Sequence, residues 1–228
     1  MNSITLKSGK SWPLNTAYNG DCLEFMKELP DKCIDLVLTD PPYGINQGGG
    51  KNHTRGLLAK PKNYKDYGDK NPLTKAHFQE MERISKHQIY FGANHYISLI
   101  PFNSSSWLIW DKQNYGTDFA DCEIAWTSHK TAIRKYTFMW NGMLQGNMKN
   151  KEIRIHPNQK PVDLFSMILR DYSKEDDLIF DACLGSFAVP IACYKNKLDW
   201  LGCEKDPDYF KAGQERYLQE TKQLLMEF

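Results

Sequence analysis

The alternation of short apolar runs with amphipathic segments is the feature that most constrains how this chain can fold. Residues 33–39 form an apolar, β-branched run that stops abruptly at Asp40-Pro41-Pro42, which predicts a buried strand running into a rigid loop. The preceding residues 21–29 have apolar positions at helical spacing and are closed by Pro30, so we expect a helix there. A helix that feeds a buried strand is the repeating unit of an α/β sheet.

The same alternation continues to the end of the chain. It predicts strands at 87–94, 106–111, 177–186 and 199–206, and helices at 187–196 and 207–225. Pro190 fits the first of these helices only if it lies in the first turn, where its missing N–H would have no partner anyway. We therefore predict an α/β fold with a twisted, mostly parallel sheet of about seven strands and helices on both faces.

Two basic segments interrupt this pattern. Residues 46–75 hold seven basic and two acidic residues with little apolar periodicity, and residues 130–154 hold six basic residues and one acid, interleaved with aromatics. Such segments suit nucleic acid, although a solvated surface explains the charges almost as well. We expect a single domain over 1–228 with both segments as insertions. The candidate DNA-binding residues are Lys51, Arg55, Lys60, Lys62, Lys65, Arg134 and Lys135.

Composition sets wider limits on the function. The 228 residues carry 29 Lys and Arg against 28 Asp and Glu, so the net charge itself gives no argument for nucleic-acid binding. The six cysteines form no CxxC pair and have no zinc-ligand spacing to histidine, which predicts buried, reduced thiols and no metal. The most apolar C-terminal run is interrupted by Asp181 and Pro190, and no signal peptide is evident, so we expect a cytoplasmic protein without a membrane partner.

The sharpest chemical signal is Asp40-Pro41-Pro42-Tyr43, because open α/β sheets place their ligands at the carboxyl ends of the strands. An amine on an aromatic base is a poor nucleophile. A carboxylate from Asp40 and the carbonyl of Pro41 could accept its two N–H groups and stabilise the positive charge that develops during attack. The prolines would fix the backbone, and Tyr43 would offer a stacking face to a base that has left the duplex. A rigid turn with Asp40 as a cap is the alternative.

With these residues the chain resembles the amino-methyltransferases of DNA, in which D/N/S-PP-Y/F is the catalytic motif. Further stretches resemble that family in the order of its beta group: Asn19 to Cys22, residues 110–128, His156-Pro157-Asn158-Gln159-Lys160-Pro161, residues 180–186 and residues 202–210. The resemblance implies the Rossmann-like fold of S-adenosylmethionine-dependent methyltransferases, with an antiparallel last strand. It also implies S-adenosylmethionine as cofactor, DNA as substrate and a possible homodimer.

The resemblance implies a cofactor site in which Asp21 contacts the adenine and Glu204 binds the ribose hydroxyls. Gly185 would let the backbone approach the ligand closely, and Asp181 would either anchor the turn or meet the amino-acid part of the cofactor. The candidate cofactor-binding residues are Asp21, Cys22, Asp40, His156, Asn158, Gln159, Lys160, Asp181, Gly185, Ser186, Glu204 and Lys205.

One residue departs from the family pattern, because Phe187 stands where a second glycine of the loop is expected. A phenylalanine does not easily take a positive φ. Either the loop has a single tight position and Phe187 packs on the ligand or the core, or cofactor binding is weakened. We expect the first.

These motifs predict methylation of the N6 amine of adenine in DNA. The alternatives are N4 methylation of cytosine, for which the family more often has Ser in place of Asp40, and methylation of a protein glutamine, which usually goes with Asn-Pro-Pro-Tyr. A catalytically inactive module that binds DNA or cofactor is a further alternative, which Phe187 keeps open.

Overall fold

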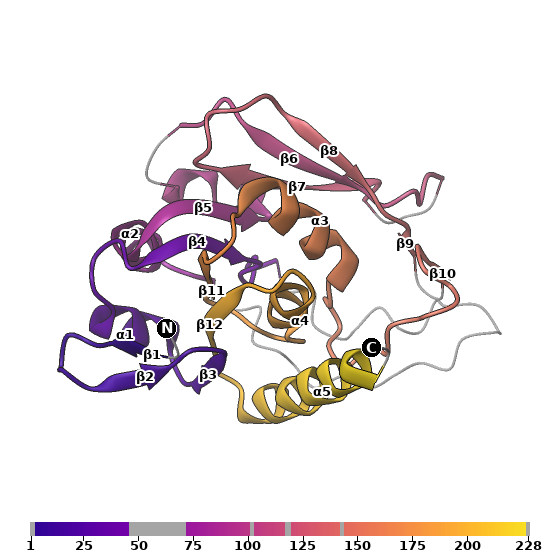
Figure 1. Cartoon of the computed structure of the whole chain (residues 1–228). Helices are drawn as coiled ribbons and strands as arrows, with labels where there is room; N and C mark the ends of the chain where they lie inside the picture. Colours follow the sequence, from indigo (N-terminus) through magenta and orange to yellow (C-terminus); the bar gives the residue numbers. More distant parts are fainter. Residues whose placement is uncertain (1–2, 46–71, 101–102, 117–119, 142–143, 227–228) are drawn as a thin grey trace.

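The computed structural model describes residues 3–45, 72–100, 103–116, 120–141 and 144–226 (Figure 1). The predicted DNA contacts Lys51, Arg55, Lys60, Lys62 and Lys65 lie outside these ranges. In chain order the strands and α-helices are β1 (Ser3–Thr5), β2 (Ser11–Pro13), β3 (Thr16–Asn19), α1 (Cys22–Glu28), β4 (Ile34–Thr39), α2 (Lys75–Ile84), β5 (Ser85–Phe91), β6 (Trp107–Asp111), β7 (Cys122–Thr127), β8 (Arg134–Thr137), β9 (Trp140–Asn141), β10 (Leu144–Gln145), α3 (Val162–Tyr172), β11 (Leu178–Asp181), α4 (Ala188–Lys195), β12 (Asp199–Glu204) and α5 (Pro207–Met226).

The main sheet has eight strands among the described residues, in the order β3-β12-β11-β4-β5-β7-β6-β8. Strand β7 pairs antiparallel with both of its neighbours, and every other pair is parallel. The predicted mostly parallel sheet is therefore confirmed. The prediction of an antiparallel last strand is wrong, because β12, the last strand of the chain, runs parallel to β11 and β3. The ten residues between β6 and β7 are too few for the helical crossover that a parallel pair needs, which explains why the reversal falls there.

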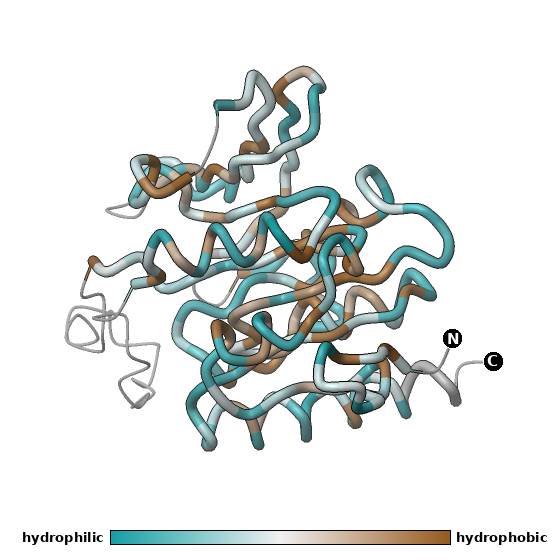
Figure 2. Tube along the Cα trace, turned by 90° about the vertical axis from the view of Figure 1, so that its left-hand side faces the viewer, coloured by the Kyte–Doolittle hydropathy of each residue, from teal (hydrophilic) through white to brown (hydrophobic). Residues whose placement is uncertain are grey.

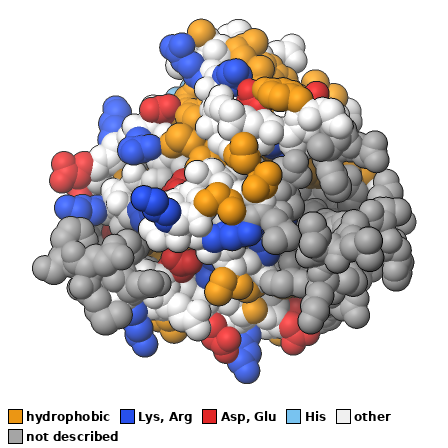
Figure 3. Space-filling model, turned by 90° about the vertical axis from the view of Figure 1, so that its right-hand side faces the viewer, with side chains coloured by type: hydrophobic (Ala, Val, Ile, Leu, Met, Phe, Trp, Pro, Cys, Tyr) orange, Lys and Arg blue, Asp and Glu red, His pale blue; other side chains and the backbone are white. Residues whose placement is uncertain are grey.

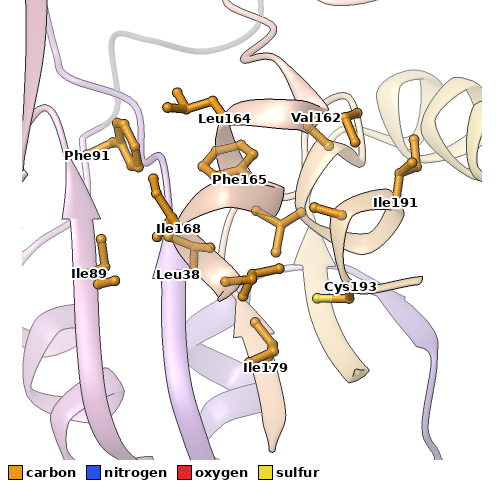
Figure 4. Close-up of a cluster of buried hydrophobic side chains, with 14 of the residues drawn as sticks. Leu38, Ile89, Phe91, Val162, Leu164, Phe165, Ile168, Ile179, Ile191 and Cys193 are labelled. Carbon is orange, nitrogen blue, oxygen red and sulfur yellow. The ribbon is translucent and has the colours of Figure 1, made fainter. Parts of the chain in front are cut away.

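Helices cover both faces of this sheet, as the alternation of strand residues requires. In β4, Leu36 and Leu38 belong to one buried cluster and Val37 to another. The first cluster includes side chains of α3 and α4 (Figure 4), and the second includes side chains of α1 and α2. Hydrophobic segments accordingly lie mainly in the interior of the trace, and the outer turns are mostly hydrophilic (Figure 2). These two cores hold the strand ends rigidly in place.

The topology creates a crevice between the carboxyl ends of β4 and β11. The chain leaves β11 through α4 and reaches β12 on one side, whereas it leaves β4 toward β5 on the other side. Adjacent parallel strands whose connections depart in opposite directions leave a ligand-binding crevice at their carboxyl ends. Asp40 directly follows β4 and Asp181 ends β11, so this crevice lies between two of the predicted site residues.

Several elements differ from the expectation. Helix α3 and the strands before α1 were not predicted. Part of the basic segment 130–154 forms β8, which joins the edge of the main sheet. Strand β5 ends at Phe91 because Gly92 takes a left-handed conformation with φ of 68°. Pro190 lies in the first turn of α4, as predicted. Within the described residues, no helix is long and apolar enough to cross a membrane.

Candidate active site

The loop after β4 places Asp40 and Tyr43 next to each other. The Tyr43 hydroxyl donates to Oδ1 of Asp40 at 2.5 Å. Its ring stacks on His95 with 4.9 Å between ring centroids, and it covers Gly92, where a Cβ atom would overlap the ring. Gly92, which follows β5, therefore makes room for the tyrosine of the loop after β4. One face of Tyr43 is already covered by His95, so the stacking face predicted for a base is partly occupied in this conformation.

A buried network of charges surrounds Asp40. The Lys160 Nζ atom lies 2.6 Å from Oδ2 of Asp40 and 3.0 Å from Oε2 of Glu123. Glu123, in β7, also forms an ion pair with Lys112, which follows β6. The Lys160 ammonium also donates to the Tyr43 hydroxyl at 3.2 Å. Lys160 therefore links the loop after β4 to the antiparallel strand β7.

The charges in this network determine its protonation. Burial raises the pKa of Asp40, and the Lys160 ammonium opposes that rise. Burial would also raise the pKa of Glu123, but Lys160 and Lys112 outweigh it and lower that pKa to about 2. The two carboxylates raise the pKa of Lys160 well above its usual range despite its burial. Lys160 is therefore charged at neutral pH, and its charge favours the anionic form of Asp40.

The glycine loop after β11 is held by two acidic residues. Oδ1 of Asp181 accepts from the Thr39 hydroxyl at 2.7 Å and from the Cys183 N–H at 3.0 Å, so this aspartate anchors the turn. Its burial raises its pKa to about 7. The Gly185 N–H donates to Oε2 of Glu204 at 2.8 Å. Gly185 has a φ of 47°, and a Cβ there would meet nothing closer than 3.9 Å, so its outer side is open.

The glycine loop has two residues with positive φ, so the prediction of a single tight position is wrong. Both Gly185 and Phe187 have positive φ, and Phe187 adopts the left-handed region at φ 60° and ψ 31° as the N-cap of α4. Its ring is 1 % exposed and packs edge-on against Trp200 and Phe210. A Cβ at Gly213 of α5 would overlap this ring. Packing of the ring on the core therefore offsets the backbone strain, and the expected core contact is confirmed.

A cavity of about 520 Å³ opens at the carboxyl ends of the strands. Asp40 to Tyr43 form one part of its wall, and residues after β3, β11 and β12 form much of the rest. The predicted cofactor residues that line it are Asp21, Cys22, Asp40, His156, Asn158, Gly185, Glu204 and Lys205. Its volume lies within the range of about 300–1,000 Å³ that is usual for small-molecule and cofactor sites.

The other predicted cofactor residues lie beside this cavity. Asp181, Ser186, Gln159 and Lys160 line an adjoining space of about 50 Å³ that shares Asp40 and His156 with the large cavity. Gln159 is buried, and its side-chain oxygen accepts from the Ile155 N–H at 3.0 Å. The Ser186 carbonyl accepts from buried Arg216 of α5. Gln159 and Ser186 therefore have structural contacts that the sequence did not indicate.

His156 contributes a neutral ring to the cavity. Burial, with a further contribution from Lys160, lowers its pKa to about 4. Its Nδ1 accepts from the Asn158 N–H at 3.2 Å, so in the neutral ring the proton lies on Nε2. The ring packs edge-on against Tyr209 of α5 and lies beside Gly185.

Some residues of the site were missed by the sequence analysis. Glu123 and Lys112 lie in the stretch 110–128 that resembles the family, yet nothing in their spacing showed that they would reach Lys160. His77 and Tyr209 also line the large cavity. Tyr209 lies in the family-like stretch 202–210 but was not singled out, and no motif marked His77. The predicted DNA contacts Arg134 and Lys135 lie on the exposed edge strand β8, where Lys135 reaches Asp111 at 3.3 Å.

Comparisons with known proteins identify the family of this chain. The model of a DNA methylase family covering N6 and N4 amino-methyltransferases matches residues 58–215, so the chain belongs to this family. It is 26% identical to the type II methyltransferase M2.MboI of Moraxella bovis, over 92% of this chain and 90% of the relative.

Solved structures support the fold. An M1.HpyAVI–SAM complex matches with a TM-score of 0.56 and 21% identity, over 88% of this chain and 98% of the other. The PvuII DNA methyltransferase, described as cytosine-N4-specific, matches with a TM-score of 0.58 and 16% identity, over 92% of each chain. The chain therefore has the fold of S-adenosylmethionine-dependent DNA methyltransferases.

Proposed function

We propose that this chain transfers a methyl group from S-adenosylmethionine to the exocyclic N6 amine of adenine in DNA. The observation that carries the proposal is the position of Asp40. Its carboxylate is largely buried in the wall of the cavity, its negative charge is supported by Lys160, and the Pro41 carbonyl follows it directly in the chain. A carboxylate and a carbonyl side by side can accept both N–H groups of one amine.

The described residues suit S-adenosylmethionine. Glu204 and Asp21 are carboxylates in the cavity wall, and each oxygen that already accepts one backbone N–H can accept a hydroxyl or amine as well. The open side of Gly185 allows close approach of a ligand. When bound, this cofactor supplies an electrophilic methyl group on a sulfonium centre.

The residues around Asp40 account for activation of the amine. In this structure the Tyr43 hydroxyl donates to Oδ1 of Asp40. An N–H group of the incoming amine either displaces this hydroxyl or donates to the same oxygen beside it. Asp40 then stabilises the positive charge that develops on nitrogen, while Lys160 stays on Oδ2 and fixes the carboxylate. Tyr43, once released, becomes available to the base.

The DNA-facing role of the segment 130–154 rests on its surface. On the face that carries β9 and β10 in Figure 1, Lys and Arg side chains are intermixed with hydrophobic ones (Figure 3). Leu144, Met148 and Ile153 of this segment are exposed. Basic side chains that bind phosphates next to apolar ones that contact bases suit DNA. A homodimer remains an expectation from the family resemblance.

Cytosine N4 methylation is the second candidate. The chemistry of amine activation is the same, and the PvuII enzyme with a similar fold is described as cytosine-N4-specific. Asp40 in the first position of the catalytic motif favours adenine, by resemblance to the family.

The mutation Asp40→Ala tests the role of the carboxylate. We expect methyl transfer from labelled S-adenosylmethionine to DNA to be lost, since removal of such a group at a developing charge costs about 2.7–4 kcal/mol. Cofactor affinity, measured by calorimetry, should stay within a few-fold of the wild-type value. Turnover at the wild-type rate in this variant would remove Asp40 from the mechanism.

A further inference from the structure

Two cysteines and a histidine from three separate parts of the chain meet in the wall of the large cavity. Cys22 begins α1, Cys183 follows β11, and His77 lies in the first turn of α2. Cys183 and His77 are the neighbours that most strongly affect the Cys22 thiol and lower its pKa. The Cys22 sulfur lies within 4.8 Å of a ring nitrogen of His77 and a carboxylate oxygen of Asp21. The sequence predicted buried, reduced thiols, and this arrangement places one of them among polar partners at a cavity.

The orientation of His77 matters for this cluster. Its Nδ1 accepts from the Thr74 N–H at 3.1 Å, which caps α2, so in the neutral ring the proton lies on Nε2. Nε2 faces Asp21 at 3.8 Å. A ring nitrogen that carries a proton can donate to a thiolate but cannot bind a metal. The Lys205 ammonium, 2.9 Å from Asp21, also disfavours a cation here. The geometry favours a thiolate over a metal site.

The surroundings stabilise the charged form of Cys22. Cys183 makes the largest contribution to lowering the pKa of Cys22, and His77 adds to it. Burial and Asp21 act in the opposite direction, and the net result is a pKa of about 6. The pKa of Cys183 is raised, mainly by Cys22. The titratable and charged groups that face Cys22 from the surrounding elements are Asp21, His77, Cys183, Cys203 and Lys205. Half-buried Cys33 lies outside the cluster, and burial raises its pKa to about 11.

We propose that Cys22 is a reactive thiolate and that Cys22 and Cys183 form a reversible disulfide in the wall of the cofactor cavity when the protein meets a peroxide. Cys22 attacks one peroxide oxygen, the O–O bond breaks, and the second oxygen leaves as hydroxide that takes up a proton. The Cys22 sulfenic acid is then attacked by the Cys183 sulfur, and a second water leaves. Two thiols and one hydrogen peroxide thus give one disulfide and two waters.

The consequence for the cofactor rests on the proposed function. Cys22 and Cys183 line the same cavity as Asp21, Gly185 and Glu204, so bound S-adenosylmethionine would cover the thiolate. Oxidation would in turn change the wall against which the cofactor lies. The methyl donor and oxidation at Cys22 would therefore exclude each other.

The test is the pH dependence of alkylation in the reduced, full-length protein without cofactor. Short pulses of iodoacetamide between pH 5 and 9, followed by peptide mass spectrometry, give a rate for each cysteine. We expect the Cys22 rate to reach half its maximum near pH 6, whereas the rate of Cys33 still rises at pH 9.

A matched variant removes the imidazole ring without losing the cap. In His77→Gln the glutamine oxygen can still accept from the Thr74 N–H at this position of the capping box. We expect the Cys22 midpoint to move up by about 1 pH unit or more, because the imidazole N–H that stabilises the thiolate has been lost. A wild-type midpoint at pH 8 or above, or a midpoint unchanged in His77→Gln, would overturn the proposal of a reactive thiolate.

Oxidation is tested separately. One equivalent of hydrogen peroxide should give a linked Cys22–Cys183 peptide pair that a reductant separates, and in Cys183→Ser a sulfenic acid at Cys22 should be trapped by dimedone. Absence of both products would overturn the disulfide. Protection of Cys22 by S-adenosylmethionine is measured last. If the midpoint and the disulfide are as expected but the cofactor gives no protection, the placement of the cofactor is wrong while the reactive pair stands.

Discussion

Lys160 joins two carboxylates that would otherwise repel each other. It is 6 % exposed, and its ammonium contacts both Asp40 and Glu123. Because all three groups are largely removed from water, each depends on the others for its charged form. The lysine of the predicted cofactor motif thus acts on the carboxylate that we propose to be catalytic.

The mutation Lys160→Met should therefore be costly. Removing one partner of a buried pair leaves uncompensated charge, and we expect the free energy of unfolding to fall by about 3–5 kcal/mol. Methyl transfer should fall as well, with its acid limb moved to higher pH, because the pKa of Asp40 rises further without the ammonium. Urea unfolding and initial rates against pH measure both effects.

A matched control uses a more exposed ion pair. Lys195 lies 3.2 Å from Asp163, and both side chains are about one-third exposed. Lys195→Met should change the unfolding free energy by about 0–1 kcal/mol. Equal losses in the two variants would show that the buried network has no special importance.

Asp181 gives a prediction about pH and stability. Its ordinary pKa of 3.8 is raised to about 7 in the folded chain by burial, so the folded state binds its proton more tightly than the unfolded state. The stability that this proton provides is fully present below pH 3.8 and is lost as the pH rises through 7. In Asp181→Asn, whose side-chain oxygen can still accept from Thr39, this loss should disappear. Urea titrations from pH 5 to 8 that give equal pH slopes for both proteins would contradict it.

At this scale the sequence predicted part of the site. Asp40 and Tyr43 were predicted because a short motif carries their chemistry within the chain. Glu123 was not, because its importance comes from the pairing of β7 with β5 and β6, which brings it to Lys160 across 37 residues of sequence. Residues whose role depends on strand order are not visible in local spacing.

Among the elements, α5 and the start of α4 depend on each other. Gly213 in α5 leaves the space that the Phe187 ring fills, and that ring holds the left-handed N-cap of α4 beside the glycine loop. Buried Arg216, one turn further along α5, donates to the Ser186 carbonyl and forms an ion pair with Glu152. The C-terminal helix thus fixes the shape of the glycine loop after β11.

The mutation Gly213→Ala tests this contact. In an ordinary helix the change would stabilise by about 0.5–1 kcal/mol. Here the added methyl would overlap the Phe187 ring, so we expect destabilisation by about 1–3 kcal/mol and weaker cofactor binding. Gln214→Ala, at the exposed neighbouring position, is the control and should be nearly neutral. A stabilised Gly213→Ala variant would contradict the packing described here.

The elements that the sequence predicted correctly are those with strong local patterns. They include the units formed by α1 and β4 and by β11, α4, β12 and α5. Helix α3 escaped notice although its sequence is amphipathic, and the position of the antiparallel strand was wrong. The buried position of the Phe187 ring could not be foreseen, because the space for it is left by a glycine 26 residues away.

For the whole molecule, the fold explains why chemistry concentrates at one edge of the sheet. The reversal of connections between β4 and β11 opens a crevice there, and the loops after β3, β4, β11 and β12 line it with carboxylates and glycines. Membership of the DNA methylase family and this geometry lead to the same reaction, methyl transfer to an exocyclic amine.

The most direct test of this account is the identity of the methylated nucleoside. Unmethylated DNA is incubated with the protein and S-adenosylmethionine that carries a deuterated methyl group, digested to nucleosides and analysed by mass spectrometry, with Asp40→Ala as the control. We expect deuterated N6-methyladenine with the wild type and none with the variant. Deuterated N4-methylcytosine would contradict the assignment of adenine, and the absence of any labelled nucleoside would contradict the assignment of a DNA methyltransferase activity.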